Sequence, residues 1–216
     1  MSFEISTCSY EELTESEWEA FWSVTRTAFK EHKSNGLDMY PCRMSLEQLK
    51  VFLHGCTMFI VRDGDRIVAF RGAHLRKEGN LSYFAGQLVA VLPEYKGKGL
   101  GRLLFQAFEG YALSVGCDFL QTDTSCQAKS SLAYHRSCGF EDWCYASWSN
   151  TNYYTIILRK LLPAGRRYSS YVRYYSLIKS YLYIHFRYDR FGRERLMFRC
   201  LKVPYKLLRS LRRMES

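Results

Sequence analysis

The chain has 216 residues, which is long enough for one domain with a full hydrophobic core or for one domain with an appendage. Hydrophobic residues make up 47% of the chain and aromatic residues 16%, a composition that excludes an intrinsically disordered protein. The net charge of +10 is unevenly distributed, because residues 160–216 hold 15 Lys and Arg against 3 Asp and Glu, whereas residues 1–159 hold 16 against 18.

The eight cysteines form no Cys-x-x-Cys pair, and no Cys/His spacing is typical of a zinc site, so we expect free thiols and no metal. The first twelve residues are acidic and lack the apolar run of a secretory signal. The longest uncharged stretch, residues 143–158, is interrupted by Ser, Asn and Thr and predicts no membrane span. Free thiols without a signal favour a cytoplasmic location.

The first half of the chain shows helical and strand-like hydrophobic periodicity in turn. It predicts a strand over residues 3–9 and two helices over residues 14–32 and 45–55. An antiparallel meander of three strands is predicted over residues 57–75 and 80–92. Each helix begins at a capping box, Thr14 with Glu17 and Ser45 with Gln48. Gly86 lies inside the last strand, where a glycine suggests a β-bulge or a close backbone approach.

The second half predicts a helix over residues 101–116, a strand over 117–123 and a short helix over 128–140. A closing hairpin is predicted over residues 142–148 and 153–161. The order β-α-α-β-β-β-α-β-α-β-β indicates an α+β fold with a single β-α-β crossover. Pro163, Ala164 and Gly165 then interrupt the pattern. We therefore divide the chain into a domain over residues 1–162 and a basic, Tyr- and Arg-rich extension over residues 163–216.

A turn between the last meander strand and the following helix is rich in glycine and positive charge. It contains Gly97, Gly99 and Gly101 together with the basic residues Lys96, Lys98 and Arg102. Backbone amides at a helix N-terminus lack intrahelical partners and lie at the positive end of the helix dipole. A turn without side chains can bring an anion onto these amides. An ordinary solvated turn is the alternative, but three glycines flanked by three cations favour an anion site.

Two nucleotide motifs do not fit this turn. A P-loop requires Gly-x-x-x-x-Gly-Lys followed by Ser or Thr, and the sequence does not contain it. The dinucleotide fingerprint requires Gly-x-Gly-x-x-Gly in repeated β-α-β units, whereas the glycine spacing here differs and one such unit is predicted.

The segment VAVLPEYKGKGLGRLLFQAF, residues 89–108, resembles the acyl-CoA-binding signature of the GNAT superfamily of N-acetyltransferases. The core of that signature is Arg/Gln-x-x-Gly-x-Gly/Ala, and Lys96, Gly99 and Gly101 stand at its three positions, with Lys96 as a basic variant. A second segment, QAKSSLAYHRSCGFED, resembles the family in Tyr134, Gly139 and Phe140, with Gln127 where Asn is usual and Ser130 where Ala is usual. The resemblance covers residues 3–160 and implies the GNAT-type mixed, mostly antiparallel sheet flanked by helices.

The resemblance implies acetyl-CoA as co-substrate. Pantetheine would bond to the strand edge before the turn, the pyrophosphate to the turn itself, and Gln127 to either. The cofactor-binding residues would be Val89, Val91, Lys96, Gly97, Lys98, Gly99, Leu100, Gly101, Arg102 and Gln127. A bulge at Gly86 would help to separate this strand from the strand over residues 117–122, which opens a wedge for the thioester.

Tyr134 resembles the family residue that protonates the departing CoA thiolate. A phenol suits this role because its ordinary pKa of about 10 keeps it protonated at neutral pH. Packing of its helix against the sheet is the alternative role. No carboxylate lies on the strand over residues 81–91, so His74, Asp123 or a water relay could accept the proton of the amine. A thiol nucleophile at Cys126 or Cys138 with His135 has no suitably spaced orienting acid and is not favoured.

We therefore expect an N-acetyltransferase that transfers an acyl group directly from acetyl-CoA to an amine acceptor that the sequence does not identify. The alternative is a catalytically retired CoA-binding or interaction module whose working part is the extension. Family acceptor pockets are built from the first two helices and the closing hairpin. Five aromatic residues could contribute to such a pocket or only to the core: Trp18, Trp22, Tyr40, Trp143 and Trp148.

The extension interleaves basic residues with tyrosine and phenylalanine. Large residues at 171, 174/175, 178, 181/182 and 185 follow helical spacing, with Arg173 and Lys179 off that stripe. The runs ERLMFRCLKV and YKLLRSLRRM continue the amphipathic pattern. Such a segment could pack on the domain or on a partner subunit, as in a homodimer. It could also bind an anionic membrane surface, which would make the protein peripheral, or a nucleic acid.

Overall fold

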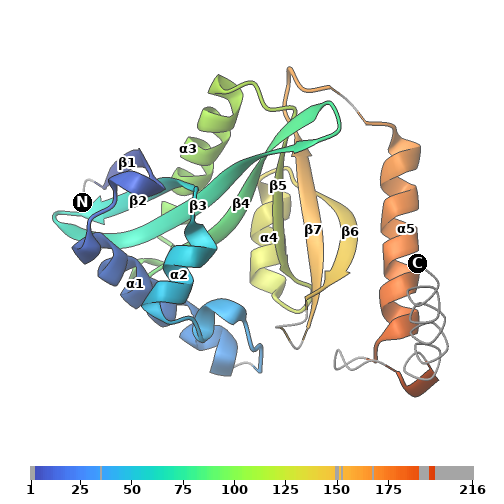
Figure 1. Cartoon of the computed structure of the whole chain (residues 1–216), viewed down its shortest axis with the longest axis horizontal. Coiled ribbons are helices and arrows are strands. Elements are labelled where there is room, and N and C mark those ends of the chain that lie inside the picture. The colour runs from blue at the N-terminus through green and yellow to red at the C-terminus, as the bar shows by residue number, and fades with distance from the viewer. Residues whose placement is uncertain are drawn as a thin grey trace, which may run out of the picture.

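The computed structural model describes residues 3–34, 36–148, 151, 153–166, 168–189 and 195–197. Within these residues the chain forms a seven-stranded sheet of order β1-β2-β3-β4-β5-β7-β6 (Figure 1). The strands are β1 (Glu4–Ser9), β2 (Thr57–Asp63), β3 (Arg66–Glu78), β4 (Leu81–Val91), β5 (Phe119–Ser125), β6 (Glu141–Ser147) and β7 (Tyr154–Leu161). Within this sheet, β4 and β5 pair in parallel and the other neighbours are antiparallel, which confirms the α+β fold.

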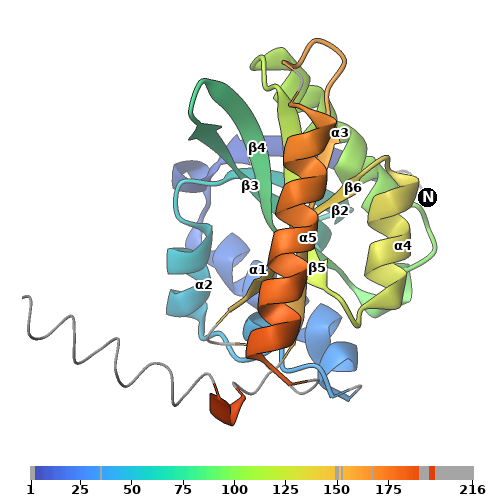
Figure 2. The ribbon, with the colours of Figure 1, turned by 90° about the vertical axis from the view of Figure 1, so that its right-hand side faces the viewer.

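Helices cover both faces of the sheet, as the views in Figures 1 and 2 show. The helices are α1 (Glu15–Ser34), α2 (Leu46–Leu53), α3 (Leu100–Ser114), α4 (Lys129–Ser137) and α5 (Ser170–Arg187), with short 3₁₀ helices η1 (Tyr10–Glu12), η2 (Tyr40–Cys42) and η3 (Pro93–Tyr95). Successive side chains of a strand point to opposite faces. Phe70 on β3 accordingly packs 4.5 Å, ring centre to ring centre, from Phe21 of α1, while the next residue, Arg71, lies over Phe108 of α3.

Both predicted capping boxes are present. Thr14 N donates to Glu17 Oε2 at 2.9 Å and Glu17 N donates to Thr14 Oγ1 at 3.3 Å. Ser45 and Gln48 make the equivalent pair at the start of α2, at 3.0 and 3.2 Å. These bonds satisfy amides that the first turn of a helix leaves unpaired, so both helices begin where the sequence predicts.

β4 carries a bulge at the predicted glycine. Gly72 of β3 pairs with Leu88, whereas the next residue of β3, Ala73, pairs with Gly86, so Gln87 is the extra residue. β4 pairs with β5 only over residues 83–85, and the pairing ends immediately before Gly86. The bulge therefore coincides with the point where the two parallel strands separate.

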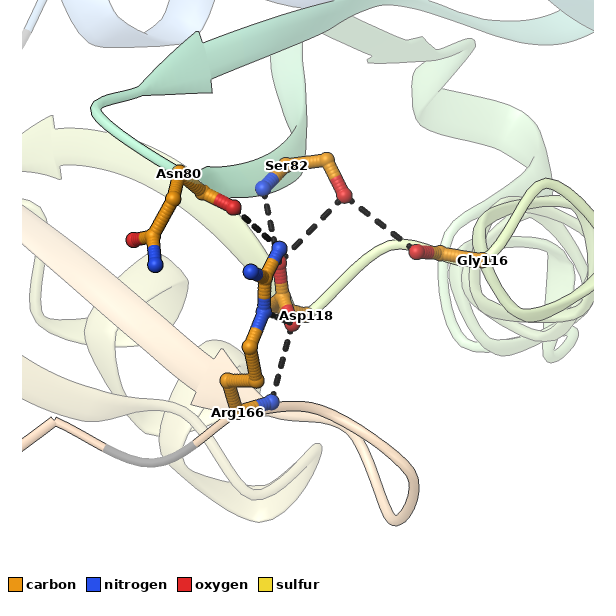
Figure 3. A network of polar contacts seen from close by, with 5 residues as sticks. All are labelled: Asn80, Ser82, Gly116, Asp118 and Arg166. Atoms are coloured by element: carbon orange, nitrogen blue, oxygen red, sulfur yellow. Dashed lines mark hydrogen bonds and ion pairs between the residues drawn. The ribbon is translucent and has the colours of Figure 1, made fainter.

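The extension begins with a segment that is fastened to the domain (Figure 3). Asp118, which precedes β5, accepts hydrogen bonds from Arg166 N at 2.9 Å and from Arg166 Nε at 3.1 Å. Arg166 Nη2 also donates to the backbone oxygen of Asn80 in the β3–β4 turn. A Cβ on Gly165 would lie 1.9 Å from the Asp118 carbonyl oxygen, so this approach requires glycine.

α5 then lies over β6 at the edge of the sheet, and Figure 2 shows it across the outside of the molecule. The helical spacing predicted from residue 171 onward is confirmed for α5. The two later amphipathic runs lie outside the described residues, apart from residues 195–197. In the described part of the chain, no helix is both long and apolar enough to cross a bilayer.

Candidate active site

The glycine turn leads from β4 through η3 into α3. Gly97 and Gly99 have φ angles of +78° and +82°, a left-handed conformation that disfavours residues with a side chain. Gly99 is the N-cap of α3 and offers no side chain to the first amides of the helix. The first backbone bond of the helix runs from Leu103 N to Gly99 O, so the amides of residues 100–102 remain available to an anion.

The three cations of the turn have different surroundings. Lys96 Nζ forms an ion pair with Glu31 of α1, so its charge is partly compensated. Lys98 Nζ lies 4.5 Å from the centre of the Tyr95 ring, and Arg102 is exposed. Arg102 and Lys98, whose charge also interacts with Glu94, therefore supply further positive charge near the amides.

Tyr134 brings the second sequence motif onto the first. Its hydroxyl donates a hydrogen bond to Gly101 O at 2.6 Å, and its ring would lie 3.6 Å from a Cβ on Gly101. The side chain is half-buried, and burial, with a smaller contribution from Cys138, raises the pKa of the phenol. Tyr134 is thus protonated at neutral pH and lies at the first turn of α3, where it also holds α4 against α3.

In the described part of the chain, the edge of β4 that faces β5 has no strand partner beyond Ala85, because β5 pairs only with residues 83–85. Val89 and Val91 lie on this stretch and are half-buried. An unpaired strand edge can bond to an extended ligand through its backbone groups. Gln127, by contrast, is exposed in the loop between β5 and α4.

Asp123 lies on β5 beyond the point where β4 and β5 separate. Its side chain points away from α4, since the neighbouring Thr124 bonds to Ser131 of α4 and successive residues alternate in direction. Solvent reaches the carboxylate, yet protein atoms surround it closely enough that desolvation raises its pKa to about 6, although a hydrogen bond from Trp148 opposes this shift. Asp123 is therefore ionised at neutral pH and a stronger base than an ordinary aspartate.

His74 on β3 is the second candidate base. It is half-buried, and desolvation together with the charge of Arg76 lowers its pKa. Its Nε2 lies 3.3 Å from Cys56 Sγ, and Cys56 precedes β2. His74 is three residues after Arg71 on β3, and successive side chains of a strand point to opposite faces. His74 therefore faces the α2 side of the sheet, opposite the side of Arg71 and Tyr134.

The thiol nucleophile considered from the sequence, Cys126 or Cys138 with His135, is not favoured by the structure. Burial raises the pKa of Cys126 to about 11, so this thiol is protonated at neutral pH. His135 is buried against Phe140, and desolvation lowers its pKa to about 3. Among the described residues, His, Cys, Asp and Glu side chains form no group of three or more that could hold a metal ion.

The aromatic residues considered for an acceptor pocket divide into two groups. Trp18 and Trp143 are buried, and Trp22 donates from its indole to Met44 O at 2.9 Å, so these three serve packing. Tyr40 is half-buried beside Phe52 of α2, and Trp148 is 47% exposed. A hollow of about 380 Å³ between α1 and the β2–β3 turn contains none of the predicted site residues.

The sequence reasoning missed Arg71. This arginine is 1% exposed on β3, and its guanidinium carbon lies 3.8 Å from the centre of the Phe108 ring. The available signal was a charged residue inside the apolar run RIVAFRGAHL, where residues 67–70, 72 and 73 are buried as well. A charge at such a position is rare unless it is paired or functional.

The comparisons with known proteins agree with this geometry. The Acetyltransferase (GNAT) family matches residues 10–140, which is more than half of the chain. The chain therefore belongs to the GNAT family of acetyltransferases.

Individual relatives are distant. An aminoglycoside N(6')-acetyltransferase type 1 from Stenotrophomonas maltophilia is 36% identical over 52 residues, which is 24% of this chain and 34% of that protein. The chain thus matches about a third of that relative's length. The ribosomal-protein-S18-alanine N-acetyltransferase from Escherichia coli has a TM-score of 0.54 and 16% identity, over 77% of this chain and 98% of its own. A chain of the NatC complex bound to Gag peptide and CoA has a TM-score of 0.58 and 13% identity, over 75% and 99%. At these identities the structural likeness shows the fold.

Proposed function

We propose that this protein transfers an acetyl group from acetyl-CoA to an amine by direct attack of the amine on the thioester. The observation that carries the proposal is the hydrogen bond from Tyr134 to Gly101 O at 2.6 Å. It joins a proton donor to the helix N-terminus at which a phosphate anion would bind. Family membership supports acyl transfer, and the CoA in the NatC structure supports the choice of donor.

Donor binding uses backbone rather than side chains. The amides of residues 100–102 face the pyrophosphate, Lys98 and Arg102 add charge, and the unpaired edge of β4 at Val89 and Val91 bonds to the pantetheine arm. Pantetheine bound along this edge brings the thioester toward Gly86, where β4 and β5 separate.

The chemistry needs one proton donor and one proton acceptor. As the amine nitrogen bonds to the carbonyl carbon, the C–S bond breaks and its electron pair stays on sulfur. Tyr134 gives its hydroxyl proton to that sulfur, and Asp123 accepts the proton of the amine directly or through water. Asp123 faces away from α4 and Tyr134 belongs to α4, so donor and acceptor approach the reaction from different sides of the sheet.

The first experiment measures acetyl-CoA affinity by calorimetry for Gly99→Ala and for a matched control, Gly64→Ala. Both glycines have positive φ and open space around an added Cβ, so both substitutions strain the backbone by about 1–2 kcal/mol. Gly64 lies in the β2–β3 turn, away from the proposed site. We expect Gly99→Ala alone to weaken acetyl-CoA binding, by about tenfold or more. Equal affinities in the two variants would remove the glycine turn from the donor site.

A second experiment separates an enzyme from a retired CoA-binding module. Thiol release from acetyl-CoA is followed with a panel of amines, including an aminoglycoside and a peptide N-terminus. We expect turnover with at least one amine, and Tyr134→Phe to lower kcat by about 10²-fold or more with little change in KM. Tight CoA binding without turnover, unchanged in Tyr134→Phe, would favour the module instead.

A further inference from the structure

Helix α5 turns its polar side toward the protein. Ser180 Oγ accepts a hydrogen bond from Tyr145 N of β6 at 2.9 Å, and Arg173 Nε donates to Asp142 O at 3.2 Å. Arg173 also forms an ion pair with Glu141 at 2.7 Å. β6 is an edge strand, and these bonds occupy backbone groups that its free edge would otherwise expose. The inner side of α5 therefore uses polar residues at the β6 edge, and Ile184 is the buried apolar residue on that side.

The outer side of α5 is apolar. Four residues spaced by three or four positions form what we call the outer stripe: Tyr171, Tyr175, Ile178 and Leu182. Their exposed fractions lie between 53% and 75%. An amphipathic helix on a water-soluble domain normally presents the opposite arrangement, with the apolar side inward. A contiguous exposed apolar surface of this kind is typical of an interaction site.

Charge indicates what covers the outer stripe. Lys179 lies 5.4 Å from the Tyr175 ring, and the sequence from residue 188 to 216 contains 9 Lys and Arg against 3 Asp and Glu. We infer that the outer stripe lies on the surface of an anionic bilayer, with its rings among the headgroups and Lys179 near lipid phosphates. A second copy bound through the stripe would bring together two chains that each carry a net charge of +10, which disfavours that occupant.

The test uses the full chain and vesicle flotation. We expect binding to vesicles of phosphatidylcholine with about one third phosphatidylglycerol, weaker binding to pure phosphatidylcholine, and loss of binding at high salt. Ile178→Ser with Leu182→Ser keeps the net charge and should lower vesicle binding by about tenfold or more, because it removes apolar area from the interface. Val51→Ser on α2, where Val51 is 77% exposed, is the matched control and should bind like the parent.

Three results would overturn the inference. If the Ile178→Ser, Leu182→Ser variant binds vesicles as well as the parent does, binding depends on charge and not on the outer stripe. A dimer that dissociates in this variant, without vesicle binding by the parent, would assign the stripe to a second copy. Binding to an RNA oligonucleotide but to neither vesicle would assign the basic segment to nucleic acid.

A different observation concerns the centre of the fold, where Arg71 carries a buried charge. Among the described residues, its Nε and Nη1 have no hydrogen-bond partner, and no carboxylate there forms an ion pair with it. Burial lowers its pKa to about 10, so it remains a cation at neutral pH. A buried charge without an anionic partner costs several kcal/mol, a cost that a bound anion would reduce.

Arg71 lies where β4 separates from β5. A Cβ on Gly86 would be 2.6 Å from Arg71 Nη2, and the pairing of β4 with β5 ends one residue before Gly86. The ionisable groups whose charges interact with Arg71 all belong to α4 or to its C-cap, and none is a carboxylate: Tyr134, His135 and Cys138. The guanidinium is therefore next to the expected position of the thioester and on the same side of the sheet as Tyr134.

We propose that Arg71 stabilises the negative charge on the CoA sulfur as the C–S bond breaks, an assignment that rests on the proposed acetyl transfer. The electron pair of the C–S bond goes to sulfur while the C–N bond forms, and the proton that neutralises the sulfur comes from Tyr134. Arg71 contributes charge and no proton. A fixed cation acts strongly here because the surrounding interior has a low dielectric constant and needs no reorganisation.

The test compares CoA with desulfo-CoA, which lacks the thiol, by calorimetry between about pH 6 and about pH 9. Both ligands bind beside the same protein groups, so pH effects common to the two ligands cancel in the ratio of affinities. In the parent protein we expect the ratio to shift toward CoA by about tenfold or more as pH rises, because a thiol with an ordinary pKa of about 8.5 ionises earlier beside a cation. Arg71→Met should abolish the shift and Arg71→Lys should keep part of it.

The two proposals fail in different ways. If the parent protein binds neither ligand, the acetyl-CoA assignment itself is wrong. If it binds both equally at every pH, acetyl-CoA binding stands and the role of Arg71 is wrong. This comparison needs only the parent protein, so it holds even if Arg71→Met does not fold.

Discussion

Two aspartates five residues apart show how surroundings decide the chemistry of a side chain. Asp118 accepts hydrogen bonds from the side chain and backbone of Arg166 and from Ser82 N, and these bonds hold its pKa below the ordinary range. Asp123 has no cationic partner among its interactions, and desolvation raises its pKa to about 6. The first carboxylate is fixed in a structural network, whereas the second is ionised at neutral pH and available as a base.

Asp123→Asn tests this difference at the scale of one residue. The folded protein holds a proton on Asp123 more tightly than the unfolded chain, in which an aspartate has a pKa of about 3.9. Ionisation therefore destabilises the fold progressively as pH rises from about 4 to about 6. We expect the variant to have a higher Tm than the parent at pH 7, with the difference vanishing below about pH 4, and to have a much lower kcat. An unchanged kcat would return the base role to His74 or to water.

At the scale of an element, β4 combines three requirements in one strand. Its bulge at Gln87 lies where the pairing with β5 ends, its edge beyond that point is open to a ligand, and Gly86 leaves room for the guanidinium of Arg71. The sequence explains Gly86 by the bulge, and the structure adds the second reason. A strand interior normally loses stability through glycine, so the position must need the missing side chain.

Gly86→Ala should destabilise the protein by about 1–3 kcal/mol, because the new Cβ would lie 2.6 Å from Arg71 Nη2 and the guanidinium is held against Phe108. Gly110→Ala, in the middle of α3 with open space around the new Cβ, is the matched control and should stabilise by about 0.5–1 kcal/mol. Urea unfolding of both variants measures the two effects. A Gly86→Ala variant as stable as the parent would show that Arg71 can move away.

At the scale of the whole molecule, one network connects segments that are far apart in the sequence. Asp118, which precedes β5, accepts hydrogen bonds from Ser82 at the start of β4 and from Arg166 in the segment after β7 (Figure 3). The network also includes Gly116, whose carbonyl oxygen accepts from Ser82 Oγ at 3.2 Å. The extension therefore leaves the domain from a fixed point, and α5 reaches β6 from there.

Arg166→Ala should lower the urea midpoint at neutral pH, and the difference from the parent should shrink as pH falls. The sign follows from the pKa of Asp118, which is lower in the folded protein than in the unfolded chain. Stability from such a carboxylate is present above the unfolded value of about 3.9 and is lost as pH falls toward the folded value. Arg66→Ala, which breaks the exposed ion pair with Glu94, is the control and should change little at any pH. A difference that is independent of pH would assign the effect of Arg166 to packing.

The sequence by itself determined the features that depend on neighbours along the chain. Hydrophobic period, capping boxes and turn glycines predicted the element order, the starts of α1 and α2, and the α+β class, all of which the structure confirms. The glycine turn and the segment around Tyr134 were also readable, because each is a contiguous pattern. Their contact at Gly101 was not predicted and needed the tertiary structure, and the roles of the site residues remain proposals.

Only the tertiary structure decided the features that depend on residues brought together from distant segments. The raised pKa of Asp123 depends on the atoms that surround its carboxylate. The burial of Arg71 depends on Phe108, which is 37 residues later in the sequence. The orientation of α5 is the clearest case: its periodicity predicted an amphipathic helix but not which side faces inward. That choice was made by the edge of β6, whose unpaired backbone groups require polar partners and therefore leave the apolar side of α5 exposed.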